Sequence, residues 1–184
     1  MRFERLLMNL FVFLCLVALP GAAGLAETST EYKVKAAFLY NFTKFVKWPS
    51  GSFASASEPL TICTLGEPPV NGILAEVLSG KTVDDRPLRA RQIQMEGDTR
   101  GCQVLFITET GISRASSLLS ALRPSGMLIV SEGANSRTRL RGLVMITFLL
   151  DSNRVRFLID NRTAEKSGLI ISSRLLSLAL GVDE

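Results

Sequence analysis

The sequence predicts an α/β fold, a single-domain sandwich with a mixed, mostly parallel β-sheet, helices on both faces, and a C-terminal β-hairpin followed by two helices. Three observations support this prediction. Short apolar runs alternate with amphipathic helical patterns. The early runs are apolar throughout, as in strands that are covered on both faces. Two later runs are joined by a short polar turn, which is typical of a hairpin.

The first 26 residues have the pattern of a secretory signal peptide. Arg2 and Arg5 precede an apolar run, residues 6–19, which is too short for an ordinary membrane span. Small residues before position 27 predict cleavage after Ala26, with Ala23 as the second choice and an uncleaved anchor as the alternative. Cleavage would leave residues 27–184 as one domain, long enough for a substantial core.

The first element expected after the signal is a helix over residues 32–46. Its apolar residues recur at helical spacing, and Pro49 ends the pattern. The predicted apolar stripe comprises Val34, Phe38, Phe42, Phe45 and Val46. We expect this stripe to face the core, although aromatic residues in this arrangement could also line a pocket or a dimer interface.

The remaining elements follow in regular alternation. Expected strands are residues 60–65, 88–94, 102–107, 127–130, 143–150 and 154–159. Expected helices are residues 72–78 after an Asn71 cap, 113–122, 161–166 after an Asn161 cap, and a last helix from Ser172 or Ser173 to about Leu180. Residues 133–141 are polar and predict a loop, whereas residues 151–153 predict the hairpin turn.

Composition excludes several classes of function. The chain has no histidine, which removes the commonest general base and transition-metal ligand. It has no glycine-rich phosphate-binding motif. Its net charge is only +4, and its basic residues form no long run, which disfavours nucleic-acid binding. We therefore expect no catalytic residues, no metal and no cofactor.

Two cysteines remain after the predicted cleavage, Cys63 and Cys102. An even number of cysteines in an exported protein predicts a disulfide, and two cysteines allow only one intramolecular pairing. The bond could be a structural link between two buried strands or a redox sensor.

Two further sites are hypotheses from position alone. Crevices at the carboxyl ends of parallel strands often bind ligands, so Glu67, with Lys81, could bind a small ligand, although an ordinary turn is the simpler interpretation. Leu158 in the hairpin, together with Ile170, could contribute to an exposed apolar patch for a protein partner.

Five segments in series resemble the YfiR-like family of bacterial periplasmic proteins. These are KAAFLYNFTKFVKWP at 35–49, LTICTLG at 60–66, the stretch 80–88, GCQVLFI at 101–107, and residues 155–176. The resemblance spans nearly all of the chain after the signal, in the order expected for the family.

The resemblance implies a periplasmic α/β domain that forms a homodimer and carries a Cys63–Cys102 disulfide. The best-known member represses an inner-membrane diguanylate cyclase by binding its periplasmic sensor region, so we expect a non-enzymatic regulator that reaches the membrane only through this partner. That member has a second disulfide near the late strands. Residues 143–155 contain no cysteine here, which puts a switch based on that bond in doubt. The alternative is a ligand-binding module of a sensory or transport system.

Overall fold

The computed structural model describes residues 22–66, 70–94, 99–121 and 126–183. The chain divides into two compact units, residues 1–30 and 31–184, and the second contains all of the described strands. The predicted signal peptide lies mostly outside the described residues. Among the helices that are described, none combines the length and the apolar character needed to cross a membrane.

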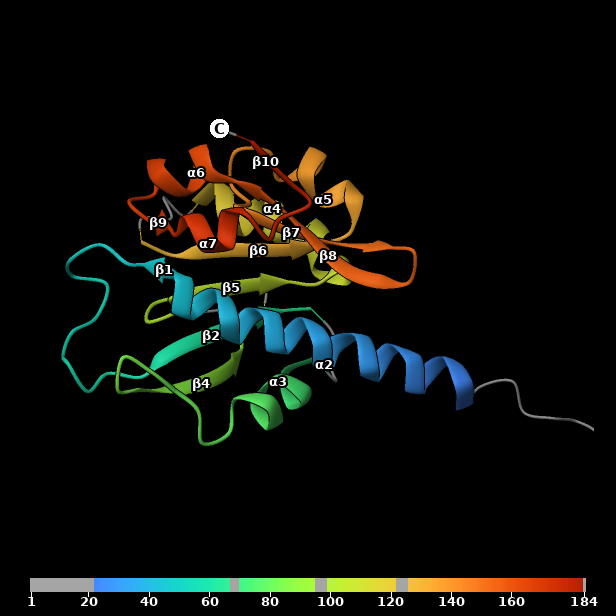
Figure 1. Cartoon of the computed structure of the whole chain (residues 1–184), viewed down its shortest axis with the longest axis horizontal. Coiled ribbons are helices and arrows are strands. Elements are labelled where there is room, and N and C mark those ends of the chain that lie inside the picture. The colour runs from blue at the N-terminus through green and yellow to red at the C-terminus, as the bar shows by residue number, and fades with distance from the viewer. Residues whose placement is uncertain (1–21, 67–69, 95–98, 122–125, 184) are drawn as a thin grey trace, which may run out of the picture. The chain divides into compact units, whose positions relative to one another are not determined.

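An eight-stranded sheet forms the centre of this unit (Figure 1). Its order is β10 (Gly181–Asp183), β8 (Arg154–Asp160), β7 (Ile146–Asp151), β6 (Leu128–Glu132), β5 (Val104–Ile107), β2 (Leu60–Leu65), β4 (Arg86–Gln92) and β3 (Thr82–Val83). The five strands from β7 to β4 are parallel, β8 runs against β7, and β10 is parallel to β8. The predicted fold class is confirmed.

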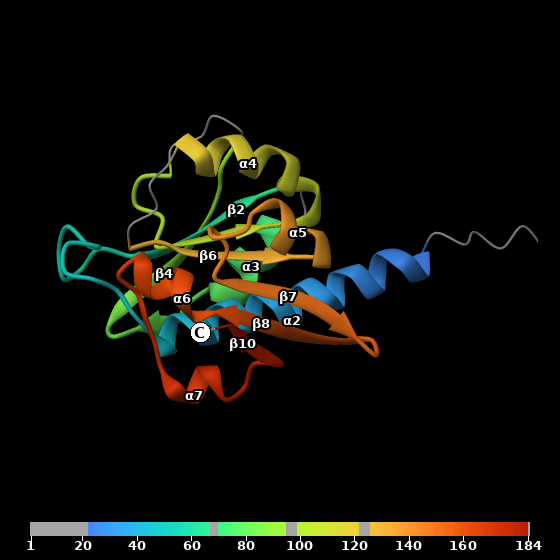
Figure 2. The same cartoon turned by 90° about the horizontal axis from the view of Figure 1, so that it is seen from above.

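Helices cover both faces of the sheet (Figure 2). The helix α2 (Ala22–Phe45) and α3 (Val70–Leu78) pack into one core cluster, whereas α4 (Ile112–Ala121) contributes to the other. The short helix α5 (Ala134–Arg139) lies beside α4. Near the C-terminus, α6 (Asn161–Lys166) and α7 (Ser173–Leu176) flank β9 (Ile170–Ile171), which pairs with β1 (Val46–Lys47).

Phenylalanine rings attach α2 to the sheet. The ring of Phe42 is fully buried, and its centroid lies 5.0 Å from that of Phe157 and 5.6 Å from that of Phe148. Full burial of one such side chain contributes about 1.5–3 kcal/mol. The first helix is therefore part of the core, as its apolar pattern predicts.

The predicted stripe on this helix was partly wrong. Val34 is exposed, whereas Lys35 and Leu39 are buried. The buried face of the helix therefore includes Lys35, which forms ion pairs with Glu31 and Glu132.

Both hairpin turns have the geometry of a two-residue turn of type I′, which requires positive φ at both central residues. Ser152 and Asn153 have φ of 50° and 60°, as the predicted hairpin needs. Asp84 and Asp85 have φ of 48° and 62° and join β3 to β4. This second hairpin was missed because β3 contains only two residues.

Four local predictions were wrong. Part of the predicted loop at 133–141 is the helix α5. The cap of α6 is Asp160 rather than Asn161, since the Asp160 carboxylate accepts a hydrogen bond from Thr163 N. The helix α3 begins at Val70, so Asn71 lies in its first turn. The last helix, capped by Ser172, is a single turn, and residues 181–183 form the edge strand β10.

Candidate functional site

The strand order changes direction between β2 and β5. From β2 the chain moves through α3 to β4 on one side, and from β5 it moves through α4 to β6 on the other side. Because α3 and α4 cover opposite faces, the carboxyl ends of β2 and β5 lie where open α/β sheets form ligand crevices. This edge is the first place to look for a functional site.

At this edge the residues that end β2 and follow β5 are in direct contact. Thr108 N donates to the carbonyl oxygen of Leu65 at 3.0 Å. A Cβ on Gly66 would lie 1.7 Å from Thr108 Oγ1, and a Cβ on Gly111 would lie 2.3 Å from Leu65 O. The described residues therefore leave no space for a ligand between Leu65 and Thr108.

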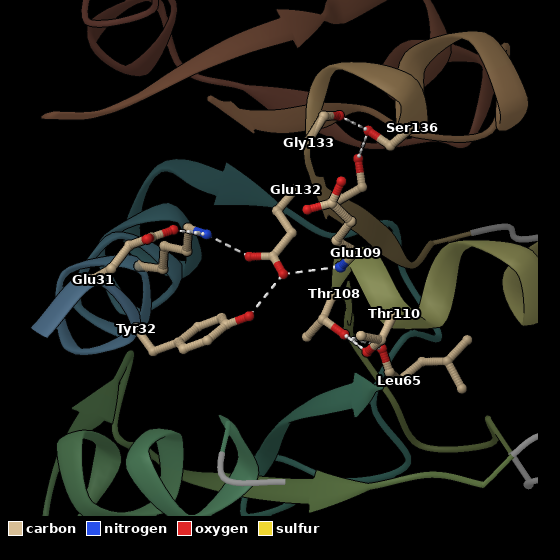
Figure 3. A network of polar contacts seen from close by, with 11 residues as sticks. Glu31, Tyr32, Leu65, Thr108, Glu109, Thr110, Glu132, Gly133 and Ser136 are labelled. Atoms are coloured by element: carbon tan, nitrogen blue, oxygen red, sulfur yellow. Dashed lines mark hydrogen bonds and ion pairs between the residues drawn. The ribbon is translucent and has the colours of Figure 1, made fainter. Parts of the chain in front are cut away.

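A buried polar network lies beside this contact, at the end of β6 (Figure 3). Glu132 is 4% exposed and accepts hydrogen bonds from Tyr32 Oη at 2.9 Å and from Glu109 N at 2.9 Å. Lys35, which is 5% exposed, forms ion pairs with Glu132 and with Glu31 one turn earlier in α2. The network thus joins the helix, the end of a central strand and the loop after β5.

Electrostatics keep Tyr32 protonated. Burial is the largest effect that raises the pKa of Tyr32 above its usual range, and the negative charge of Glu132 and their hydrogen bond raise it further. Tyr32 therefore acts as a hydrogen-bond donor, and both oxygens of Glu132 have partners. The geometry suits a structural link between α2 and the sheet better than acid–base catalysis.

Of the two residues predicted to bind a small ligand, Glu67 and Lys81, the structure describes only Lys81. Glu67 lies outside the described residues. The carbonyl of Lys81 accepts from Leu88 N, and Leu88 is in register with Leu60 at the amino end of β2. The ammonium group of Lys81 lies 5.6 Å from the centroid of the Tyr40 ring. Lys81 therefore lies at the opposite end of β2 from Gly66.

Leu158 and Ile170, which were predicted to contribute to a partner surface, lie in different sheets. Leu158 is in β8, opposite Gly181 of the edge strand β10. Ile170 is in β9, opposite Lys47. Leu158 lines a groove of about 810 Å³ next to α5 and α6, and Ile170 is not among the residues that line it.

Exposed apolar side chains do occur near the C-terminus. Ile170, Leu178 and Leu180 are 63%, 59% and 48% exposed. Sequence reasoning missed Leu178 and Leu180 because the apolar run 178–180 was assigned to the last helix. These three residues are called the C-terminal apolar residues below.

Cys63 of β2 and Cys102 form a disulfide with a Cα–Cα distance of 5.7 Å. Both cysteines are buried, and the bond links β2 to the residues that lead into its neighbour β5. Such a bond fits an exported protein in an oxidising compartment. Among the residues that the structure describes, there is no cluster of three or more cysteine or carboxylate side chains that could hold a metal ion.

Comparison with known proteins gives one informative result. The family described as YfiR/HmsC-like matches residues 32–180. This span begins at Tyr32 of the buried network and includes every strand from β1 to β9. A comparison with curated proteins gives no match.

Proposed function

Because the chain belongs to the YfiR/HmsC-like family, we propose that it is a periplasmic, non-enzymatic regulator that binds the periplasmic sensor region of an inner-membrane diguanylate cyclase. Binding represses the cyclase and lowers cyclic di-GMP, and loss of the regulator favours biofilm formation. Family membership supports the general role, regulation of cyclic di-GMP signalling from the periplasm. The partner, the repression and the biofilm effect are the specific parts of the proposal.

The extent of the family match is the observation that carries this proposal. The match covers residues 32–180 and therefore nearly all of the sheet and its covering helices, rather than one short motif. The buried disulfide supports function outside the cytoplasm. The proposed export signal in residues 1–26 would deliver the chain there.

The C-terminal apolar residues are the proposed contact surface. Large exposed side chains such as Ile170, Leu178 and Leu180 are available for burial against a partner. A few side chains commonly supply most of the binding free energy of a protein interface. The regulator then represses the cyclase by binding the inactive state of its sensor region more tightly than the active state.

A non-catalytic role agrees with the buried network. Both oxygens of the Glu132 carboxylate have partners inside the protein, namely Tyr32, Lys35 and the Glu109 amide. We also propose that the regulator is a homodimer, which would present two copies of the contact surface.

Affinity capture tests the proposal directly. The tagged mature chain is incubated with detergent-solubilised inner membranes of its own bacterium, and the bound proteins are identified by mass spectrometry. We expect a diguanylate cyclase with a periplasmic sensor region, and we expect Ile170→Asp and Leu178→Asp to reduce its recovery. Leu150→Asp is the matched control, since Leu150 is 56% exposed but lies in the β7–β8 hairpin.

Two results would contradict the proposal. The first is recovery of no cyclase with the wild-type chain. The second, an equal loss of the cyclase with Leu150→Asp, would show that the C-terminal apolar residues are not the contact surface.

A second candidate function is a periplasmic ligand-binding module of a sensory or transport system. The observation that favours it is the groove beside α5 and α6, which has the size of a small-molecule site.

A further inference from the structure

The groove lies on the side of β7 and β8 where α5 and α6 contribute to its lining. On β7 and β8, the core residues Ile146, Phe148, Phe157 and Ile159 point toward α2. Side chains alternate along a strand, so Thr147 and Leu158 point to the opposite face. Both line the groove, and Leu158 is only half-buried there. The floor therefore combines an apolar surface with one hydroxyl group.

Positive side chains from separate elements converge on this floor. Arg137 comes from α5, Arg141 follows that helix, and Arg162 and Lys166 come from α6. Two carboxylates, those of Asp160 and Asp183, also line the groove. The lining therefore has an excess of positive charge.

Both carboxylates already have partners. The two oxygens of Asp160 accept from Thr163 N and Thr163 Oγ1, each at 2.8 Å. Asp183 forms an ion pair with Arg137. The groove still carries two more cationic than anionic side chains, and the exposed side chains of Arg141 and Lys166 lie at it.

We propose that this groove binds a small organic anion, with a phosphate or carboxylate group at Arg141 and Lys166 and an apolar body on Leu158. Guanidinium and ammonium groups make charge-assisted hydrogen bonds to such oxyanions. The volume of about 810 Å³ lies in the range of small-molecule sites. A free anion of this kind and the headgroup of an anionic lipid share this chemistry, and we assign the site to the free anion.

The position of the groove connects it to the proposed contact surface. The edge strand β10 supplies Val182 and Asp183 to the groove and directly follows Leu178 and Leu180. A bound anion would therefore lie next to residues that contact the cyclase. This consequence rests on the proposed function, whereas binding of the anion does not.

The test is a titration of the mature protein, at constant ionic strength, with phenyl phosphate, benzoate, inorganic phosphate and phenol. Calorimetry measures affinity, and amide NMR shifts locate the site. We expect saturable 1:1 binding of phenyl phosphate or benzoate, with shifts in α5, α6 and β10. The other two probes should bind more weakly, because each has only half of the required chemistry.

Variants separate the groove from general charge effects. Arg141→Gln with Lys166→Gln should weaken binding by about tenfold or more. Leu158→Ala should reduce the preference for phenyl phosphate over inorganic phosphate. Arg139→Gln is the matched control, since Arg139 is an exposed arginine of α5 that does not line the groove, and it should change affinity less than twofold.

Several results would overturn the proposal. They are the absence of saturable binding by both aromatic anions, an equal loss of affinity in Arg139→Gln, or equal affinity for phenyl phosphate and inorganic phosphate. Binding to phosphatidylglycerol vesicles without binding of either soluble anion would assign the groove to a membrane surface instead. These measurements use the isolated protein. A failure to bind the anions would therefore leave the proposed repression of a cyclase untouched, and a failure to capture a cyclase would leave the anion site untouched.

Discussion

The hydroxyl group of Tyr32 donates a 2.9 Å hydrogen bond to the carboxylate of Glu132, 100 residues later in the sequence. The same carboxylate pairs with Lys35, and both of its partner side chains belong to α2. Glu132 therefore links the first helix to the end of a central strand, in addition to the phenylalanine contacts.

Removing the charge of Glu132 should destabilise the protein strongly. Glu132→Gln leaves the buried ammonium group of Lys35 with Glu31 alone, and breaking a buried ion pair costs about 3–5 kcal/mol. Because Glu31 remains, we expect a loss near 3 kcal/mol in the free energy of unfolding, measured by urea denaturation.

The matched control is Glu76→Gln. Glu76 pairs with Lys33 at 3.8 Å, and both side chains are exposed, so its loss should cost less than about 1 kcal/mol. Equal effects of the two substitutions would show that the Glu132 network does not hold the helix in place.

Stability should fall at alkaline pH through Tyr32. The pKa of Tyr32 is raised above its usual value of 10.0, first by burial and then by Glu132. Above pH 10 the folded state therefore retains a proton that the unfolded state releases, so the folded state binds more protons and its stability falls as pH rises. Tyr32→Phe should lower stability at neutral pH but make its fall above pH 10 less steep.

The direct observation for this prediction is the tyrosinate absorbance at 295 nm. The chain has two tyrosines, so Tyr40→Phe leaves Tyr32 as the only titrating ring. In that variant, ionisation should occur well above pH 10, close to alkaline unfolding. Ionisation of Tyr32 near pH 10 in the folded Tyr40→Phe variant would contradict the raised pKa of Tyr32.

Two glycines should respond in opposite ways to alanine. Gly66 has φ of +148°, and its Cβ would collide with Thr108 Oγ1, so Gly66→Ala should cost at least about 1–3 kcal/mol. Gly72 lies in α3, and a Cβ there meets nothing within 4 Å. Gly72→Ala should therefore gain up to about 1 kcal/mol from helix propensity. Thermal unfolding of both variants measures these changes in stability. If Gly66→Ala is tolerated, Gly66 and Thr108 are not in the close contact described above.

The disulfide should be structural. Cys63 and Cys102 are 39 residues apart, and closing a loop of that length stabilises by about 4 kcal/mol in the chain-entropy model. We expect Cys63→Ala with Cys102→Ala to lose a large part of that free energy in urea denaturation. Because both cysteines are buried, the native bond should resist mild reductant.

Thiol titration provides the check on this bond. The denatured, unreduced mature protein should contain no free thiol. Two free thiols, or rapid reduction of the native bond, would contradict a structural role.

The parts of the fold that follow from the sequence are those with strong local patterns. Two examples are the apolar runs of β2 and β5, which indicate buried strands, and the polar turn at Ser152 and Asn153, which indicates a hairpin. In contrast, α5 has the sequence ANSRTR, which lacks an apolar stripe. Groups outside the helix hold it in place: Ser131 Oγ donates to Ser136 Oγ, and Ser136 Oγ donates to Gly133 O.

The buried network could not be found from the sequence because its partners are distant. Glu132 ends an apolar run and has the pattern of a strand end, and Lys35 has the pattern of a solvated helix position. Only the tertiary structure shows that each makes the burial of the other possible. The groove was missed for the same reason, since its cations come from α5, from Arg141 after it and from α6, which are not adjacent in the sequence.

Cyclic di-GMP measured by mass spectrometry in a deletion strain tests the central claim most directly. We predict that deletion raises the cyclic di-GMP level and that the wild-type gene returns it to the level of the parent strain. The Leu150→Asp gene should also return it, whereas the Ile170→Asp gene should not. An unchanged or lower level after deletion would contradict the claim that this protein represses a diguanylate cyclase.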